Sequence, residues 1–197
     1  TDDLSHYCFG DEDGLTIRSS EDHQEVARLP IAGTCEKARF SSDGRWISIT
    51  DWDGEQGRVE VWDWRDEECV YRVEKPATLF ASDFDHANRL FAVGHADGTV
   101  SVHDLNEKRQ LHVFPVASAP TVLEFSPDDR FLAVSCEFAF QVELYRTSDM
   151  SLQRSLEHAS HLFNVAWAPS GNRLAVVEGF EIYLWDLSSD KQLPYQT

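Results

Sequence analysis

Val59-Glu-Val-Trp-Asp-Trp64 is the stretch of this chain that decides its fold, because three related segments follow it at a nearly constant interval. The related segments are Val100-Ser-Val-His-Asp-Leu105, Val142-Glu-Leu-Tyr-Arg-Thr147 and Ile182-Tyr-Leu-Trp-Asp-Leu187. Their ring-bearing positions, Trp62, His103, Tyr145 and Trp185, are 41, 42 and 40 residues apart. Such β-branched and aromatic runs are typical of strands, and one interval kept through four segments indicates a repeat architecture.

A second landmark keeps the same interval upstream of the first. It is an aromatic residue followed by a turn sequence, such as Ser41-Ser-Asp-Gly44 or Ser126-Pro-Asp-Asp129. The aromatic residues, Phe40, Phe84, Phe125 and Trp167, are 44, 41 and 42 residues apart. Each repeat holds four short apolar runs of about five to seven residues, separated by turn residues. Four hairpin-linked strands in each repeat are typical of the blade of a β-propeller.

The repeats resemble those of the WD-repeat (WD40-type) β-propeller family, in which the third strand of a blade commonly ends in Trp-Asp. Trp62-Asp63 and Trp185-Asp186 match this pattern. His103-Asp104 matches it in part, and Tyr145-Arg146 departs from it. The resemblance covers nearly the whole chain and implies an all-β fold, a propeller of four-stranded antiparallel blades. Propellers host many functions, so the resemblance predicts the fold more specifically than the function.

The number of strands predicts how much of a propeller is present. Residues 34–75, 76–117 and 118–157 are each expected to form one blade of four strands. Residues 1–33 and 158–197 are each expected to form a partial blade of three strands, which gives 18 strands, or four to five blades. Rings of this type typically close with seven blades. We therefore expect the chain to be the C-terminal portion of a longer propeller protein, or an arc that another chain completes.

The net charge of −18 limits the partners of the chain. A field of this sign repels phosphate backbones and anionic lipids, so we expect neither nucleic-acid binding through a basic face nor membrane docking. No apolar stretch approaches the roughly 20 residues of a membrane-spanning helix. The acidic balance either keeps the protein soluble or favours a protein partner with a basic segment.

The chain has four cysteines, which lie far apart in the sequence: Cys8, Cys35, Cys69 and Cys136. No two of them form the Cys-x-x-Cys pair that zinc sites usually need. Three of them, Cys8, Cys69 and Cys136, fall in strand-like runs. We therefore expect buried free thiols, which suit a cytoplasmic protein.

No known catalytic motif occurs in the chain, so we expect a protein that is not an enzyme and has no cofactor. His158-Ala-Ser-His161 pairs two imidazoles but offers no third metal ligand nearby. The resemblance to WD repeats implies instead a histidine that bonds within its blade. Asp51-Trp-Asp53-Gly54 contains part of a calcium-loop pattern, but it falls where a hairpin turn is required.

The connections between second and third strands carry large rings at comparable places in successive repeats. These connections are expected on one face of the disc, where rigid blades hold binding loops. Aromatic residues are enriched in binding hot spots, so the rings form a candidate partner-binding set. The alternative is that the rings fold inward over the blade edges. The candidate residues are Trp52, His95, Phe138, Phe140 and Phe180.

A second regularity concerns the arginines that open the second strand of four repeats. Aspartates lie in most of the same turns, so the arginines are expected to brace the turns. The alternative is a ring of guanidinium groups that binds an anionic ligand. The arginines are Arg45, Arg89, Arg130 and Arg173.

The repeats are compatible with three functions. The first is a non-catalytic scaffold or sensor for protein–protein contact, as a module of a larger protein or complex. The second is an accessory propeller of a hydrolase that gates or positions its substrate. The third is small-ligand or metal binding in a central channel.

Overall fold

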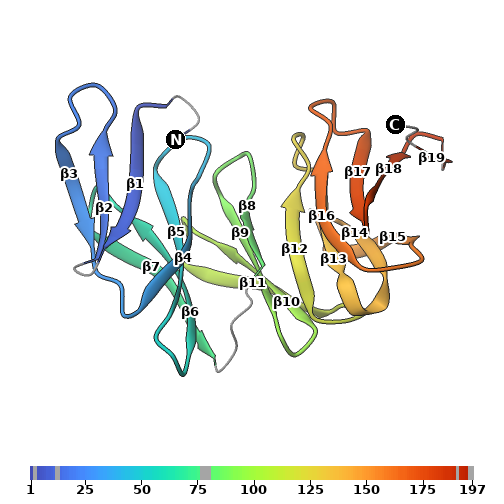
Figure 1. Ribbon diagram of the computed structural model, residues 1–197, viewed down its shortest axis with the longest axis horizontal. Helices are drawn as coiled ribbons and strands as arrows, with labels where there is room; N and C mark the ends of the chain where they lie inside the picture. Colours follow the sequence, from blue (N-terminus) through green and yellow to red (C-terminus); the bar gives the residue numbers. More distant parts are fainter. Residues whose placement is uncertain (2–3, 12–13, 76–80, 190, 195–197) are drawn as a thin grey trace. The chain divides into compact units, whose positions relative to one another are not determined.

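The computed structural model describes residues 1, 4–11, 14–75, 81–189 and 191–194. Within these ranges the chain forms nineteen strands in five antiparallel sheets, together with one short 3-10 helix (Figure 1). The chain divides into two compact units, Thr1–Phe80 and Ala81–Thr197, and each is described by itself. The all-β prediction is confirmed. The described residues contain no helix that is long and apolar enough to span a membrane.

The first unit, Thr1–Phe80, contains two sheets whose strands follow one another in chain order. Sheet 1 consists of β1 (His6–Asp11), β2 (Gly14–Ser19) and β3 (Glu25–Leu29). Sheet 2 consists of β4 (Thr34–Phe40), β5 (Trp46–Trp52), β6 (Gly57–Asp63) and β7 (Glu68–Lys75).

The second unit, Ala81–Thr197, contains three four-stranded sheets with the same simple order. Sheet 3 consists of β8 (Ser82–Phe84), β9 (Leu90–His95), β10 (Thr99–Asp104) and β11 (Arg109–Pro115). Sheet 4 consists of β12 (Pro120–Phe125), β13 (Phe131–Cys136), β14 (Gln141–Arg146) and β15 (Ser151–Glu157), with the 3-10 helix η1 (Glu137–Ala139) between β13 and β14. Sheet 5 consists of β16 (Leu162–Trp167), β17 (Arg173–Glu178), β18 (Glu181–Asp186) and β19 (Lys191–Pro194).

Sheet 5 corrects the strand count. The sequence predicts no fourth strand after Asp186, because the remaining stretch is short and contains a proline. The structure places β19 there, with Leu193 opposite Leu184 and Pro194 opposite Tyr183 at the end of the strand. Proline is tolerated at an edge because it interrupts no central ladder. The expected repeats include residues 2–3, 12–13, 76–80, 190 and 195–197, which lie outside the described ranges.

The turn between the first two strands is built alike in three sheets. The side chains of Ser41, Asp85 and Ser126 each accept a hydrogen bond from the backbone amide five residues later, at 2.9, 2.8 and 3.0 Å. A residue with positive φ precedes the second strand, as at Gly44 (67°) and Asn88 (57°). Short polar side chains and glycine tolerate this left-handed geometry, which explains why the turn sequences recur.

Neighbouring sheets within a unit pack in one repeated manner. In the second unit, Ala92 and Val102 of sheet 3 share a buried cluster with Phe125 and Leu132 of sheet 4. The positions in sheet 4 that correspond to Ala92 and Val102 are buried against sheet 5. In the first unit, Leu15 and Ile17 of sheet 1 pack against sheet 2 in the same way. Sheet 4 is therefore packed on both faces by apolar side chains of its neighbours.

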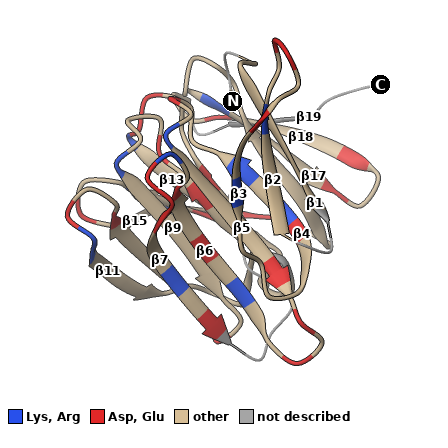
Figure 2. Cartoon of the chain, turned by 90° about the vertical axis from the view of Figure 1, so that its left-hand side faces the viewer, with Lys and Arg blue, Asp and Glu red and all other residues tan. Residues whose placement is uncertain are grey.

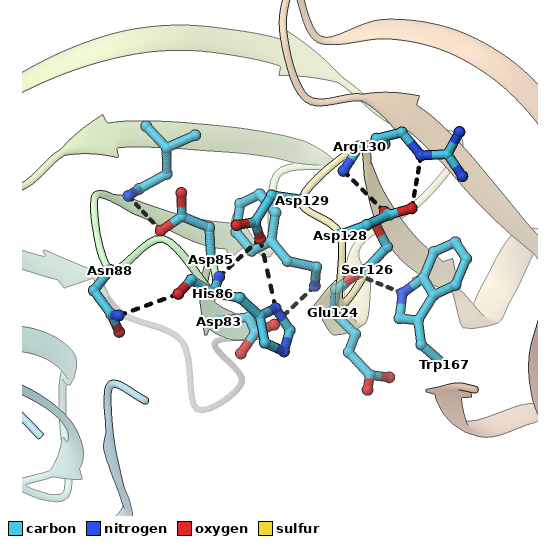
Figure 3. A network of polar contacts seen from close by, with 12 residues as sticks. Asp83, Asp85, His86, Asn88, Glu124, Ser126, Asp128, Asp129, Arg130 and Trp167 are labelled. Carbon is cyan, nitrogen blue, oxygen red and sulfur yellow. Dashed lines mark hydrogen bonds and ion pairs between the residues drawn. The ribbon is translucent and has the colours of Figure 1, made fainter. Parts of the chain in front are cut away.

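Polar contacts also join the sheets of the second unit (Figure 3). The carboxylate of Asp83 in sheet 3 accepts the backbone amide of Phe125 in sheet 4 at 2.8 Å. The carboxylate of Asp129 accepts the amide of His86 at 2.8 Å. Between sheets 4 and 5, the indole of Trp167 donates to the carbonyl oxygen of Glu124 at 3.0 Å (Figure 3). These bonds fix the register of each sheet against the next, since buried polar groups need specific partners.

The cysteines are less buried than expected. Only Cys136 is fully buried; Cys8, Cys35 and Cys69 are half-buried, and all four are free thiols. Cys35 also lies in a strand, β4, where the sequence predicts none. The difference arises because three of these residues lie at the rim of a core cluster rather than at its centre. Burial raises the pKa of the Cys136 thiol to about 11.

Candidate partner-binding surface

Sheets 4 and 5 each expose aromatic rings at the connection between their second and third strands. Phe138 lies in η1 and is 68% exposed. Phe140, which is 36% exposed, ends the same connection with a positive φ of 51°. Phe180 is fully exposed in the tight turn between β17 and β18. The sequence predicted these three rings as partner-binding candidates, and in the structure they point outward rather than into the core.

His161 contacts both the β13–β14 connection and the β17–β18 turn. Its ring meets the ring of Phe140 edge-on, with centroids 5.3 Å apart. Its carbonyl oxygen accepts the amide of Gly179, the residue before Phe180, at 3.0 Å. Phe140 and the turn that carries Phe180 are therefore neighbours through one residue. We call Phe138, Phe140, His161 and Phe180 the aromatic surface.

A buried hydrogen-bond network holds the backbone behind the aromatic surface. The carboxylate of Glu178 accepts the amide of Ala159 and Nδ1–H of His158, both at 2.8 Å. Nε2 of His158 accepts the indole N–H of Trp185 at 3.3 Å. His158 thus bonds within its own sheet, which agrees with the structural role that the family resemblance implies. The amide of His158 also donates to the carbonyl oxygen of Phe140 at 2.8 Å.

The charge of Glu178 is stabilised by this network. Burial alone would raise its pKa, but the bonds from His158 and Ala159 lower the pKa below its ordinary value. An ionised carboxylate accepts hydrogen bonds strongly. The loop before β16 is therefore a rigid support for the exposed rings.

His95 differs from the other candidates because its side chain is buried. Nε2 of His95 lies 2.8 Å from the hydroxyl of Ser101, and Nε2 of His103 lies 3.0 Å from the same hydroxyl. Burial, and then the neighbouring His95, lower the pKa of His103 to about 4. His95 is thus part of an interior network of sheet 3 and does not belong to the aromatic surface.

Trp52 lies in the first unit, at the end of β5, and is half-buried. The turn that follows is a hairpin turn, as expected. The carboxylate of Asp53 accepts the amides of Glu55 and Gln56 at 2.9 and 2.8 Å. These bonds lower the pKa of Asp53 and occupy its carboxylate in shaping the turn. Among the described residues, no three His, Cys, Asp or Glu side chains gather closely enough to hold a metal ion.

Two exposed apolar residues of sheet 5 were not predicted. Phe163 is 62% exposed and Ile182 is 44% exposed. The register of β16 shifts between Leu162 and Asn164, and this irregularity contains Phe163. A bulge redirects side chains, and no local sequence pattern signals it here. Ile182 corresponds to Val142, which packs in a buried cluster with sheet 5. Among the described residues of the second unit, no further sheet covers Ile182 in that way.

The four regular arginines all bind carboxylates, but in three sheets the carboxylate lies outside the turn that the arginine was expected to brace. Nε of Arg45 lies 3.0 Å from Asp63, and Nε of Arg89 lies 2.7 Å from Asp104. Nε of Arg173 lies 3.7 Å from Asp186. In these three sheets the aspartate ends the third strand, opposite the start of the second. Arg130 instead binds Asp128 in its own turn at 2.6 Å.

Comparison with known proteins gives one distant similarity. No protein-family model matches the sequence. Over 133 residues the chain is 28% identical to the U3 small nucleolar RNA-associated protein 18 homolog of Arabidopsis thaliana. This stretch covers 64% of the present chain but only 24% of the plant protein, so the similarity spans about a quarter of that relative.

Proposed function

We propose that the five sheets are blades of a WD-type β-propeller, and that the chain is a non-catalytic platform for protein–protein interaction. The blade assignment is supported by the simple strand order of each sheet and by the repeated turns. It is also supported by the packing of successive sheets within each unit through equivalent faces. These features are what blade stacking requires.

The observation that carries the proposed role is the exposure of Phe138 and Phe180 on short, hydrogen-bonded connections. Large apolar rings in solvent are unfavourable unless a partner covers them, and aromatic rings are frequent anchors at the centre of protein interfaces. The network around Glu178 holds the connections in place before binding. A preformed surface loses less conformational entropy when a partner docks.

The chemistry of the chain favours a protein as the partner. The net charge of −18 repels polyanions such as RNA. Figure 2 shows basic segments scattered among acidic ones on the strands and turns in view. The plant relative is associated, by its name, with the U3 small nucleolar RNA. By analogy, we propose that this chain contacts a protein component of an RNA-containing assembly, through a segment that includes basic residues.

The test is a quantitative comparison of the proteins retained by the immobilised chain and by the double variant Phe138→Ser/Phe180→Ser. The matched control is Val113→Ser/Leu152→Ser, because these apolar side chains are also exposed, by 54% and 50%, in the same unit but lie on outer strands. We expect the Phe138→Ser/Phe180→Ser variant to lose at least one protein that both the wild-type chain and the control retain. Identical retention by all three chains would disprove the role of the aromatic surface.

A further inference from the structure

The pairing of arginine with aspartate is broken in one sheet. In sheets 2, 3 and 5, an arginine before or at the start of the second strand binds the aspartate that ends the third strand. In sheet 4 the corresponding position is Arg146, which lies opposite Phe131 as Asp104 lies opposite Leu90. Sheet 4 therefore places a second guanidinium group where the others have a carboxylate.

The two arginines of sheet 4 turn to other partners. Arg130 binds Asp128 through Nε at 2.6 Å, and Figure 3 shows its terminal nitrogens directed away from that carboxylate. Arg146 lies 3.4 Å from Asp149 and donates to the side-chain oxygen of Gln153 at 2.7 Å. A guanidinium group has five N–H donors, so one carboxylate does not saturate it.

Two cavities adjoin at this place in the fold. One, of about 360 Å³, lies between sheets 4 and 5. The other, of about 390 Å³, lies against the turns of sheet 4. They share Arg130, Phe131 and Gln153 in their linings, so they form one groove. Each volume is in the range that holds a ligand side chain or a small molecule, roughly 300–1,000 Å³.

The groove gathers guanidinium groups within an acidic chain, and Asp128 and Asp149 pair with two of them from outside its lining. Its lining includes Arg130, Arg146 and Arg154 but only one carboxylate, that of Asp129. The chain as a whole has a net charge of −18. The apolar part of the lining consists of Phe131, Leu144 and Leu187. The guanidinium carbon of Arg130 lies 5.5 Å from the centre of the Phe131 ring. The groove thus combines donors for a carboxylate with a surface for an apolar side chain.

We propose that this groove binds an acidic peptide segment of a protein partner. A glutamate or aspartate of the segment lies between Arg130 and Arg146, and a neighbouring apolar side chain packs on Phe131 in the cleft between sheets 4 and 5. This proposal rests on the proposed role of the chain as a protein-binding platform. A peptide with few charges is repelled less by the acidic chain than a nucleic acid is, since repulsion grows with the charge of the partner.

The test measures fluorescence polarisation of a short labelled peptide in which glutamate alternates with leucine and phenylalanine. A second peptide has glutamine at every glutamate position. We expect the wild-type chain to bind the glutamate peptide about 10-fold more tightly than the glutamine peptide, because a charge-assisted pair contributes on the order of 1.4 kcal/mol. Arg146→Asp is expected to remove this preference by restoring the arginine–aspartate pair of the other sheets.

Arg109→Asp is the matched control, because it changes the charge equally in sheet 3 and lies outside the groove. It is expected to keep the preference for glutamate. Arg146→Gln replaces Arg146→Asp if thermal unfolding shows that the latter does not fold. Equal binding of the two peptides by the wild-type chain, or an unchanged preference in the folded Arg146 variant, overturns the proposal.

A failure of the groove proposal and a failure of the proposed platform function give different results in the peptide and retention experiments. If the groove is wrong and the platform is right, the peptides do not discriminate, while Phe138→Ser/Phe180→Ser still loses a retained protein. If the platform is wrong, that double variant retains the same proteins as the wild-type chain, whatever the peptides show.

Discussion

Sheets 3 and 4 place different chemistry at the same two positions of their third strands. In sheet 3, the hydroxyl of Ser101 lies between the imidazoles of His95 and His103. In sheet 4, the carboxylate of Glu143 accepts the phenol of Tyr145 at 2.8 Å and the side-chain amide of Gln141 at 2.9 Å. The register of both third strands shifts at equivalent points, so the backbone is the same and only the buried polar groups differ.

The difference shows that the repeat determines the strand register but not the identity of the buried polar side chains. One sheet fills these positions with a hydroxyl and an imidazole, and the other uses a carboxyl group and a phenol. The same holds at the end of the strand, where Asp104 of sheet 3 binds Arg89 and Arg146 of sheet 4 does not bind Arg130. Each sheet can therefore diverge at its edge without a change of fold. Four predictions test this comparison, from the largest expected effect to the smallest.

Glu143→Ala is expected to lower the free energy of unfolding by about 3 kcal/mol. The change removes the nearer of the two acceptors of the Tyr145 hydroxyl and the acceptor of the Ala117 amide. Ser101→Ala in sheet 3 should lower it by only about 1 kcal/mol, because one neutral hydroxyl is lost. Urea unfolding of both variants provides the comparison, and equal losses would contradict the assigned difference between the sheets.

Acid is expected to weaken the second unit through His103. Its pKa is about 4 in the folded chain, lowered by burial and by His95, against an ordinary value of about 6.5. Between these values the unfolded chain binds a proton that the folded chain does not, so stability falls as the pH decreases from about 6.5 to about 4. The loss is on the order of 3 kcal/mol.

His103→Gln should remove this part of the pH dependence. The difference between the wild-type and variant curves isolates His103 from the carboxylates that titrate in the same range. Parallel curves from pH 7 to pH 4 would show that His103 is not held neutral by the fold.

Asp104→Ala should destabilise the chain by about 2 kcal/mol, whereas Arg146→Ala at the corresponding position should change stability by less than about 0.5 kcal/mol. Asp104 is buried and accepts the amides of Asn106 and Glu107 at 3.0 and 2.9 Å besides Nε of Arg89. Arg146 is exposed. Thermal unfolding measures both, and a loss for Arg146→Ala that matches Asp104→Ala would mean that the two edges are equivalent.

Phe138→Ser/Phe180→Ser should leave the free energy of unfolding within about 0.5 kcal/mol of the wild-type value. Both rings are exposed and belong to none of the buried clusters described. Urea unfolding measures this value. A loss of several kcal/mol would mean that the rings support the sheets, which was the alternative interpretation of the sequence.

The strands were predictable because their signals are local. Apolar runs and turns such as Ser126-Pro-Asp-Asp129 depend only on neighbours in the sequence, and two landmarks kept the same interval. The strand at Lys191–Pro194 was not predicted, because its pairing with β18 outweighs a proline that local propensity counts against it.

The candidate site was predictable only in part. Phe138, Phe140 and Phe180 follow from the pattern of large rings in turns. His95 occupies a similar place in the sequence, but its burial depends on Ser101 and on the neighbouring sheet, which no local pattern reports. The groove at Arg146 likewise depends on two sheets meeting, although the departure from Trp-Asp marked its position.

The most direct test of the account is the dissociation constant of the purified principal partner, measured by titration against the folded wild-type chain and the Phe138→Ser/Phe180→Ser variant. The account predicts that the variant binds about 100-fold more weakly, because two aromatic anchors that each contribute about 1.4 kcal/mol together weaken binding by two factors of ten. It also predicts an unchanged constant for Val113→Ser/Leu152→Ser. An equal dissociation constant for all three chains would contradict the assignment of the aromatic surface as the partner-binding site.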